Sequence, residues 1–444
     1  MQKQARTLIV VAIVILSALL AGGFFIYNRK QITNVAIDQD VTSGATSTIE
    51  EIPIATEDSS NFQNIALELA RVAKESQELA VQTQEFLAQE KEKSLVKEKS
   101  AQVKGIYINE FLANSQTSFA KTYRENIKRM LRETELNGVV IDIKENMGPN
   151  LSDSLKTFIN ELHQKNIWVI ARICVFRDSS LREEKPEWYL KDSLTTSSDN
   201  IWRDASDASW LDASSTEAQA YLIDFSKKAI DFGFDELQFD YVRFPSDGEL
   251  NNIVYPFYDA EQEKYEIMGN FFFKLARDLK EYKPSIILSA DLFGYLATQY
   301  QSSDIGQRLF DAGTYFDYVS FMLYPSHFYG GFSADYDASR ALPALNFPYE
   351  AQDIATVASN NPYPVILRSV LSGIDYLERY GLGAKVRPWL QDFNLNRDVS
   401  RGIIYDAEKI KAQIQGAQDG GSSGWLLWNS AGIYTQDAFL KVGE

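Results

Sequence analysis

Aspartates recur near the ends of short apolar segments in this 444-residue chain. Asp142 lies in GVVIDIK, Asp240 in ELQFDYVRF, Asp291 in IILSADLFGY and Asp392 in VRPWLQDF. Two carboxyl groups can cleave a glycosidic bond without a metal, because one protonates the leaving oxygen while the other attacks the anomeric carbon or activates water. Aromatic residues, whose flat faces hold sugar rings, make up 13% of the chain. The pattern therefore predicts carboxylate chemistry on a sugar.

The four aspartates carry different expectations. We expect Asp240 to act as nucleophile or base and Asp291 as its acid–base partner, because they come from neighbouring predicted strands. Asp142 and Asp392 are alternatives for the second carboxylate, or else they bind substrate. The remaining candidate substrate-binding residues are polar or aromatic and lie near other strand ends: Arg172, Arg243, Tyr324, His327, Gln391 and Trp428. A structural ion pair with an arginine or lysine is the competing interpretation for any single aspartate.

Other chemistries lack the residues they need. Cys174 is the single cysteine and the two histidines are His163 and His327, so neither a disulfide nor a Cys/His zinc site is expected. No GxSxG, GxGxxG or GxxxxGK[ST] motif occurs, which disfavours a serine nucleophile and a phosphate-binding loop. A net charge of −17 disfavours nucleic acid. We expect no cofactor and no metal.

Eight apolar segments read as strands, and segments with helical character lie between most of them. The predicted strands are 105–109, 138–144, 167–176, 236–244, 286–295, 318–325, 386–393 and 424–429. Strands that alternate with helices pair in parallel, and eight such units predict a (β/α)8 TIM barrel. An open doubly wound sheet is the alternative, although its usual Gly-rich loop is missing.

Chemistry in such a barrel collects at the carboxyl ends of the strands. Strict alternation places Asp142 and Lys144 on one face of their strand, and it aligns Gln238 with Asp240 and Ser289 with Asp291. It turns Arg243 away from that face unless the strand ends near Pro245.

The long segment 177–215 is rich in Ser and Asp and is expected to cover the cleft. Its residues Trp188, Trp202 and Trp210 either form outer sugar subsites or pack a small core of the loop itself. We expect Cys174 to be a buried core thiol and His163 to lie on a helix surface.

The motifs FDYVRFPSDG, GVVIDIKENMG, SADLFG, FMLYPSHFYGG and RPWLQDF resemble a bacterial family of glycosyl hydrolase domains of unknown specificity. The resemblance covers nearly all of 104–444 and implies a TIM-barrel glycosidase with a carbohydrate substrate. A more distant similarity is to family-eighteen chitinases, whose fourth strand ends in a catalytic Glu. Val242 stands at that position, so the chitinase mechanism is not expected. The segment GWLLWN is similar to the chitinase strand that places a Trp under the sugar, which makes Trp428 a candidate platform.

The first hundred residues have a different composition. Residues 8–27 carry no charge and are long enough to cross a bilayer, so we expect 1–30 to form a cytoplasmic tip and uncleaved signal anchor. A cleaved signal peptide is the alternative. Residues 31–60 are acidic and lack Lys and Arg beyond the span, which predicts a flexible linker outside the cytoplasm. Residues 61–100 lack Gly and Pro and predict a helical stalk, followed by the barrel domain at 101–444.

The predicted stalk carries apolar residues on alternating three- and four-residue steps: Phe62, Ile65, Leu69, Val72, Leu79 and Phe86. The steps fit either a coiled coil that forms a homodimer or an amphipathic spacer.

The sequence as a whole predicts a membrane-anchored, extracytoplasmic glycoside hydrolase that cleaves a cell-surface or environmental polysaccharide. A catalytically inactive sugar-binding barrel is the alternative. A metal-dependent deacetylase is disfavoured by the two isolated histidines.

Overall fold

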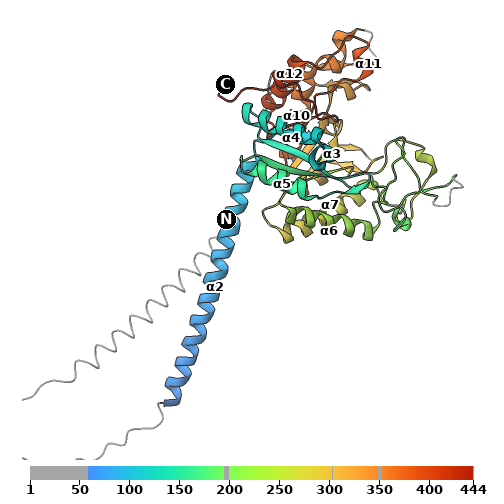
Figure 1. The fold of residues 1–444 in the computed structure, drawn as a ribbon. Coiled ribbons are helices and arrows are strands. Elements are labelled where there is room, and N and C mark those ends of the chain that lie inside the picture. The colour runs from blue at the N-terminus through green and yellow to red at the C-terminus, as the bar shows by residue number, and fades with distance from the viewer. Residues whose placement is uncertain (1–58, 195–199, 303, 349–352, 444) are drawn as a thin grey trace, which may run out of the picture. The chain divides into compact units, whose positions relative to one another are not determined.

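The computed structural model describes residues 59–194, 200–302, 304–348 and 353–443 (Figure 1). The predicted anchor at 8–27 and nearly all of the predicted linker therefore lie outside the described residues. Within the described ranges, no helix combines the length and the apolar character needed to cross a bilayer.

Eight parallel strands close into a barrel, which confirms the predicted fold. The strands run in the order β1, β2, β4, β6, β8, β11, β15 and β16, and β16 pairs with β1 to close the ring. Their bounds are Lys104–Ile108, Gly138–Glu145, Trp168–Cys174, Glu236–Asp240, Ile287–Phe293, Tyr318–Leu323, Trp389–Gln391 and Trp425–Trp428. All eight predicted strands are found, although segment 386–393 is divided between β14 (Lys385–Val386) and β15, and β6 ends four residues earlier than predicted.

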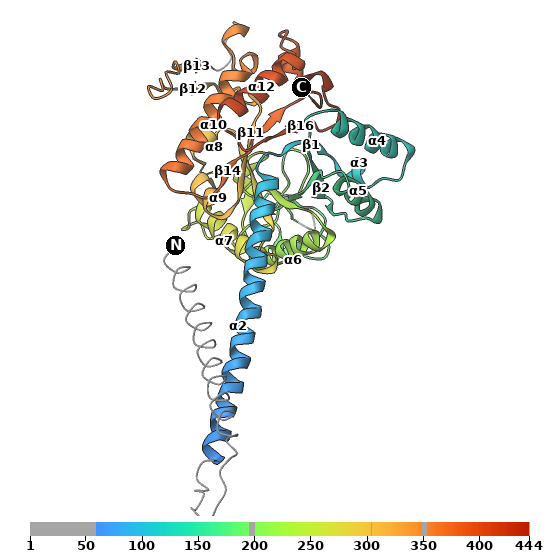
Figure 2. The ribbon, with the colours of Figure 1, turned by 90° about the vertical axis from the view of Figure 1, so that its left-hand side faces the viewer.

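Helices connect the strands and surround them (Figure 2). The seven crossover helices are α4 (Ser118–Glu133), α5 (Asp153–His163), α6 (Thr216–Phe232), α7 (Lys264–Tyr282), α9 (Leu309–Tyr315), α10 (Pro362–Arg379) and α12 (Ala407–Asp419). Shorter helices are α3 (Glu110–Asn114), α8 (Leu296–Gln299) and α11 (Asn396–Val399). Short strands β3, β5, β7, β9, β10, β12 and β13 lie in the loops, at Gly148–Pro149, Lys191–Asp192, Ile253–Val254, Gln301–Ser302, Gln307–Arg308, Phe332–Ala334 and Leu345–Phe347.

Alternation along the strands divides the core into two layers. Val139 and Ile141 pack with residues of the surrounding helices, whereas Val140 packs with Ile170 and Trp389 in a separate cluster inside the barrel. Polar pairs also fill the interior, since Gln238 donates to the Ser320 hydroxyl at 3.1 Å. The barrel is thus a filled core whose chemistry must lie at a strand end.

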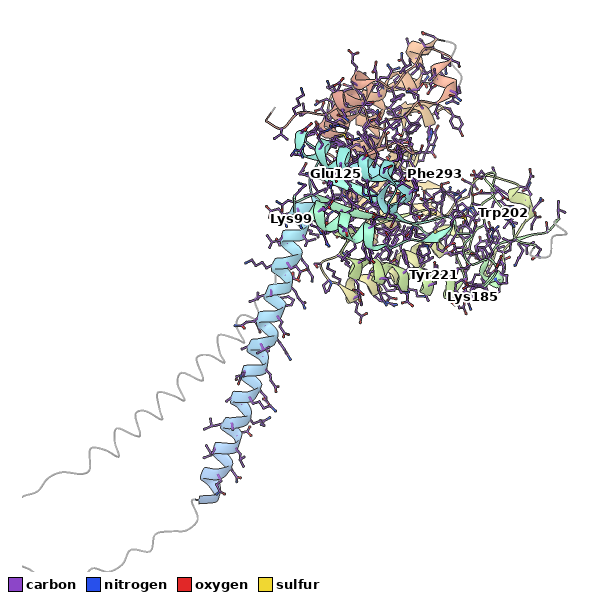
Figure 3. The ribbon with its side chains drawn as sticks, viewed as in Figure 1. Lys99, Glu125, Lys185, Trp202, Tyr221 and Phe293 are labelled. Carbon is purple, nitrogen blue, oxygen red and sulfur yellow. The ribbon has the colours of Figure 1, made fainter. Side chains whose placement is uncertain are left out.

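The segment 177–215 forms a lobe with the loop that follows β6. The two loops pair through β5 and β7, and the Trp202 indole donates to the Glu249 carbonyl at 3.0 Å. Figure 3 labels Trp202 in this lobe. Trp202 and Trp210 are buried, so these two side chains pack the core of the loop and form no sugar subsite. Cys174 is buried as predicted. His163 is only half-buried and bonds Asp235 at 2.9 Å.

The predicted stalk is a single helix, α2 (Ser59–Ser100). The chain divides into two compact units between Glu90 and Lys91, so the last turns of α2 belong to the barrel unit. There Ser100 is fully buried, its hydroxyl lies 2.8 Å from the Tyr318 hydroxyl, and its carbonyl accepts from Arg387 at 3.2 Å. These contacts lie near the amino ends of the strands and close that end of the barrel.

Candidate active site

One guanidinium group organises the carboxyl ends of the strands. Arg172 of β4 donates through Nη1 to Asp142 at 2.5 Å and to Glu145 at 2.7 Å. It donates through Nε and Nη2 to the same oxygen of Asp240, at 3.1 and 2.5 Å. Its Nε also lies 3.7 Å from Asp291 Oδ2. Four carboxyl groups from three strands therefore surround one buried cation.

Three of these carboxyl groups have shifted pKa values, and the shifts do not all have the same direction. Burial, reinforced by the nearby Asp240 charge, raises the pKa of Asp291 well above its ordinary value. Burial likewise raises the pKa of Asp142, against the opposing effect of Arg172. Burial opposes ionisation of Glu145 too, but Arg172 outweighs it and the pKa of Glu145 is lowered. The site therefore shifts the pKa values of neighbouring acids in opposite directions, a pattern that separates an acid from a base in acid–base catalysis.

Asp240 and Asp291 are the best placed of these groups to act together. Asp240 Oδ2 and Asp291 Oδ2 lie 3.1 and 3.7 Å from the same Arg172 nitrogen, which limits the separation of the two oxygens to the sum of these distances. Asp240 is 8% exposed, against 1% for both Asp291 and Asp142. Asp291 is held from its other side by the Trp389 indole, which donates to Oδ1 at 2.8 Å. Both side chains are thus buried, and Asp240 keeps slightly more of its surface exposed than Asp291.

Aromatic rings form one wall of the site. Trp428 lies 4.1 Å from Tyr107 between ring centroids and 5.6 Å from Trp389, and the Arg172 guanidinium stacks on it at 5.0 Å. Trp428 is only partly buried, so some of its surface is exposed at the strand ends. The Tyr107 hydroxyl donates to Asp142. This wall can hold a sugar ring next to the carboxyl groups.

Comparison with known families identifies the domain. A family model described as a putative glycosyl hydrolase domain matches residues 149–434. The chain belongs to this glycosyl hydrolase family. The match includes Arg172, Asp240 and Asp291, whereas Tyr107, Asp142 and Glu145 precede it.

Solved structures with a similar fold include several sugar-cleaving enzymes. The glycoside hydrolase domain of PgaB (BpsB) from Bordetella bronchiseptica is 12% identical over 75% of this chain and 95% of that chain, with a TM-score of 0.49. The α-galactosidase TtGalA from Thermus thermophilus is 13% identical over 76% of this chain and 60% of that chain, with a TM-score of 0.42. A hypothetical protein from Ruminiclostridium thermocellum ATCC 27405 is 28% identical over 42% of this chain and 96% of that chain, with a TM-score of 0.34. With TM-scores below 0.5, these similarities say nothing about the substrate. No curated protein sequence matches the chain.

Two local irregularities build the site of this glycosyl hydrolase domain. The pairing of β2 with β4 shifts register between Asp142 and Lys144, so one extra residue stands in β2. Because of this bulge, Glu145 joins Asp142 on Arg172, while Lys144 pairs with Asp178 at 2.8 Å. The alternation predicted for Lys144 is therefore wrong.

The second irregularity follows Asp240. Tyr241 has φ +52°, a left-handed conformation that a tyrosine rarely adopts, and its backbone N–H donates to Asp240 Oδ1 at 2.6 Å. This turn ends β6 and orients the Asp240 carboxylate. Strained residues of this kind concentrate at functional sites.

Other predicted site residues lie outside the Arg172 cluster. The Asp392 carboxylate accepts from the Thr435 backbone N–H and hydroxyl, both at 2.9 Å. Gln391 is fully buried and its amide donates to Ser326 and Phe393. Both side chains hold loops at the carboxyl end of the barrel. The His327 and Tyr324 rings meet edge to face, with their centroids 5.2 Å apart. Burial and the charges of Asp291 and Asp240 raise the pKa of the buried Tyr324.

Three residues of the site were not among the predicted ones: Tyr107, Glu145 and Trp389. Tyr107 and Trp389 lie in predicted strands, so period-two alternation could have placed them inside the barrel. Glu145 could not be found in this way, because the bulge in β2 leaves no sequence signal. Among the described residues, no group of three or more His, Cys, Asp or Glu side chains has a metal-binding arrangement.

Proposed function

We propose that this domain hydrolyses glycosidic bonds in a polysaccharide, with Asp240 as nucleophile or base and Asp291 as acid. The observation that carries the proposal is that the two carboxyl groups share one Arg172 nitrogen while burial raises the pKa of Asp291. The Trp428 ring supplies a platform for the sugar beside them.

The chemistry follows from these positions. Asp291, whose pKa is raised by burial, donates its proton to the leaving glycosidic oxygen, and Asp240 attacks the anomeric carbon. Water then releases the sugar from Asp240, and its proton returns to Asp291. Carboxyl separations of roughly 5–5.5 Å belong to retaining enzymes and roughly 6.5–9.5 Å to inverting ones. The upper limit set by Arg172 barely enters the inverting range, which favours retention.

The Asp240→Asn variant tests this assignment on a panel of polysaccharides. We expect hydrolysis to fall by several orders of magnitude, as when a catalytic group is removed from other hydrolases. Asp392→Asn is the matched control, because Asp392 directly follows strand β15 but contacts Thr435 instead of Arg172. A decrease for Asp392→Asn with none for Asp240→Asn would refute the assignment.

The sugar-binding alternative is tested with the same proteins. A barrel that only binds would retain oligosaccharides on both variants, and the wild type would release no reducing ends from any glycan. Release of reducing ends that depends on Asp240 rejects the alternative.

We also propose that residues 8–27 anchor the protein and that the barrel lies outside the cytoplasm. The uncharged span and the Lys/Arg-free acidic segment that follows it support this location. External protease added to intact cells should release a soluble barrel fragment. A barrel that remains fully protected would refute the orientation.

A homodimer through α2 is the third part of the proposal. The apolar residues Ile65, Leu69, Val72, Leu79 and Phe86 are 42–54% exposed along this helix. Burial of such a stripe against a second copy would remove it from water. Sedimentation of the full chain should show a dimer that Leu79→Asp dissociates, and a monomeric wild type would contradict it.

A further inference from the structure

Arg243 differs from the other buried arginines of the described chain. Arg172 and Arg387 pair with carboxylates, whereas Arg124 and Arg368 each donate to two or more backbone carbonyls. Arg243 is 6% exposed, yet it donates a single hydrogen bond, from Nη1 to the Phe244 carbonyl at 2.9 Å. No described carboxylate lies within ion-pair distance of it. Most of its five N–H donors are therefore unused.

Aromatic rings hold this guanidinium in place. It lies over Phe293 at 4.7 Å, Trp210 at 5.0 Å and Tyr241 at 5.1 Å, measured to the ring centroids. Phe293 ends β8 (Figure 3) and Tyr241 directly follows Asp240, so the guanidinium sits between two strand ends of the site. Its Nε and Nη2 lack hydrogen bonds but are not among the polar atoms sealed from solvent. Both atoms therefore keep some contact with solvent.

A buried, unpaired cation is costly, because burial removes water from its charge. Burial accordingly lowers the pKa of Arg243. An arriving anion would replace the lost water, and a planar carboxylate matches the two parallel N–H donors of a guanidinium.

We propose that Arg243 binds a carboxylate on the sugar next to the bond that is cleaved, so that the substrate is a polysaccharide containing uronic acid. This inference rests on the proposed hydrolase function. Arg172 cannot take this role, because Asp142, Glu145 and Asp240 already occupy it.

The net charge of the whole molecule opposes the binding of an acidic polysaccharide. A net charge of −17 repels polyanions at long range. A preference for an acidic polysaccharide must then come from a local contact. An alternative role for Arg243 is to change the reactivity of Asp240 through its charge. Loss of that role would affect acidic and neutral substrates equally, whereas loss of a carboxylate contact would affect only acidic ones.

The experiment compares acidic polysaccharides with their carboxyl-reduced forms, in which each uronic acid becomes a neutral sugar. The panel consists of β-1,4-glucuronan, polygalacturonate and a glucuronate–N-acetylglucosamine polymer. We expect the full-length wild type to bind and hydrolyse at least one acidic form about 10- to 100-fold better than its reduced form, the range expected of charge-assisted hydrogen bonds. Arg243→Gln should abolish this preference and retain activity on the reduced form, while Arg243→Lys should keep part of it.

Arg177→Gln is the matched control, since Arg177 also lies over Tyr241, at 5.4 Å, but pairs with Asp204 at 2.7 Å. Its preference for the acidic form should equal that of the wild type.

An equal loss of activity on both substrate forms in Arg243→Gln would overturn the inference and favour an effect of Arg243 on Asp240. A wild type that favours no acidic form in binding or hydrolysis would overturn it without any variant. Carboxylate-dependent binding without hydrolysis of any glycan would uphold the Arg243 site and reject the hydrolase function. Sulfated and phosphorylated glycans bound as tightly as uronates would overturn the commitment to a carboxylate.

Discussion

Replacement of Arg172 by methionine probes the centre of the site. The substitution leaves Asp142, Asp240 and Glu145 facing one another without the cation that they share. Methionine fills a similar volume, so the main effect is electrostatic. We expect the variant to unfold at a lower urea concentration than the wild type at neutral pH.

The size of the effect follows from the burial of each partner. Removal of one partner from a buried ion pair costs about 3–5 kcal/mol. Burial raises the pKa of Asp142, which weakens its pairing with Arg172 and makes its share of the loss smaller. Glu145 is 34% exposed at its side chain and recovers solvent, so its loss is smaller. The Asp240 pair then dominates, and we expect the free energy of unfolding to fall by about 3–5 kcal/mol.

The pH dependence gives a sharper test. Arg172 lowers the pKa of Glu145 against the effect of burial, so the pKa of Glu145 rises once the cation is gone. The variant then binds protons in the folded state at a higher pH than the wild type, and its deficit shrinks on acidification. Urea unfolding followed by Trp fluorescence at about pH 8 and about pH 5 measures the change.

Arg124→Met is the control, because this buried arginine donates to the carbonyls of Leu112, Ala113 and Ser115 and not to a carboxylate. Its deficit should be nearly independent of pH. A deficit below about 1 kcal/mol in Arg172→Met at pH 8, or one that grows as the pH falls, would refute this account of the cluster.

Three further predictions concern Asp291 as the catalytic acid, the buried Glu236–Arg387 pair near the amino ends of the strands, and the stereochemistry of the product. The rate should fall as the pH rises through the raised pKa of Asp291, since the acid must be protonated, and initial rates of the wild type against pH should show this limb. Asp291→Asn should be almost inactive at every pH, and a variant that keeps the wild-type profile would assign that limb to another group. Glu236→Gln should lower the free energy of unfolding by about 3–5 kcal/mol by breaking the buried pair with Arg387, without a change in the KM of the surviving enzyme. A selective rise in KM would show that the two ends of the barrel are coupled. Proton NMR of the first product should show the anomeric configuration of the substrate, and an inverted configuration would contradict the role of Asp240 as nucleophile.

The barrel could be predicted because its strands are buried on both faces. Strands such as GVVIDIK and IILSADLFGY are continuous apolar runs interrupted only by polar residues near one end, and such runs are typical of parallel barrels. The same regularity brought Asp142, Asp240 and Asp291 into one cluster with Arg172, since up to these residues the strands keep their alternation.

The prediction failed where the backbone departs from regular geometry. The extra residue in β2 turns Glu145 toward Arg172 and Lys144 away from it, and no residue type in KENMG announces a bulge. The left-handed Tyr241 ends β6 early and places Arg243 among aromatic rings between two strand ends. At Asp392 the sequence predicted a site residue that the structure places elsewhere. An aspartate near a strand end looks the same in sequence whether it bonds a substrate or, as here, a threonine.

The end of α2 has a mechanical consequence. Ser100 is bonded to Tyr318 and Arg387, and Glu92 accepts from the Ser285 hydroxyl at 2.6 Å. Tension along the chain from residues before Lys91 would therefore load the amino ends of the strands first. Arg172, Asp240 and Asp291 lie at the opposite, carboxyl ends of the strands, beyond the filled interior of the barrel. Their geometry would persist until the contacts at the amino ends broke.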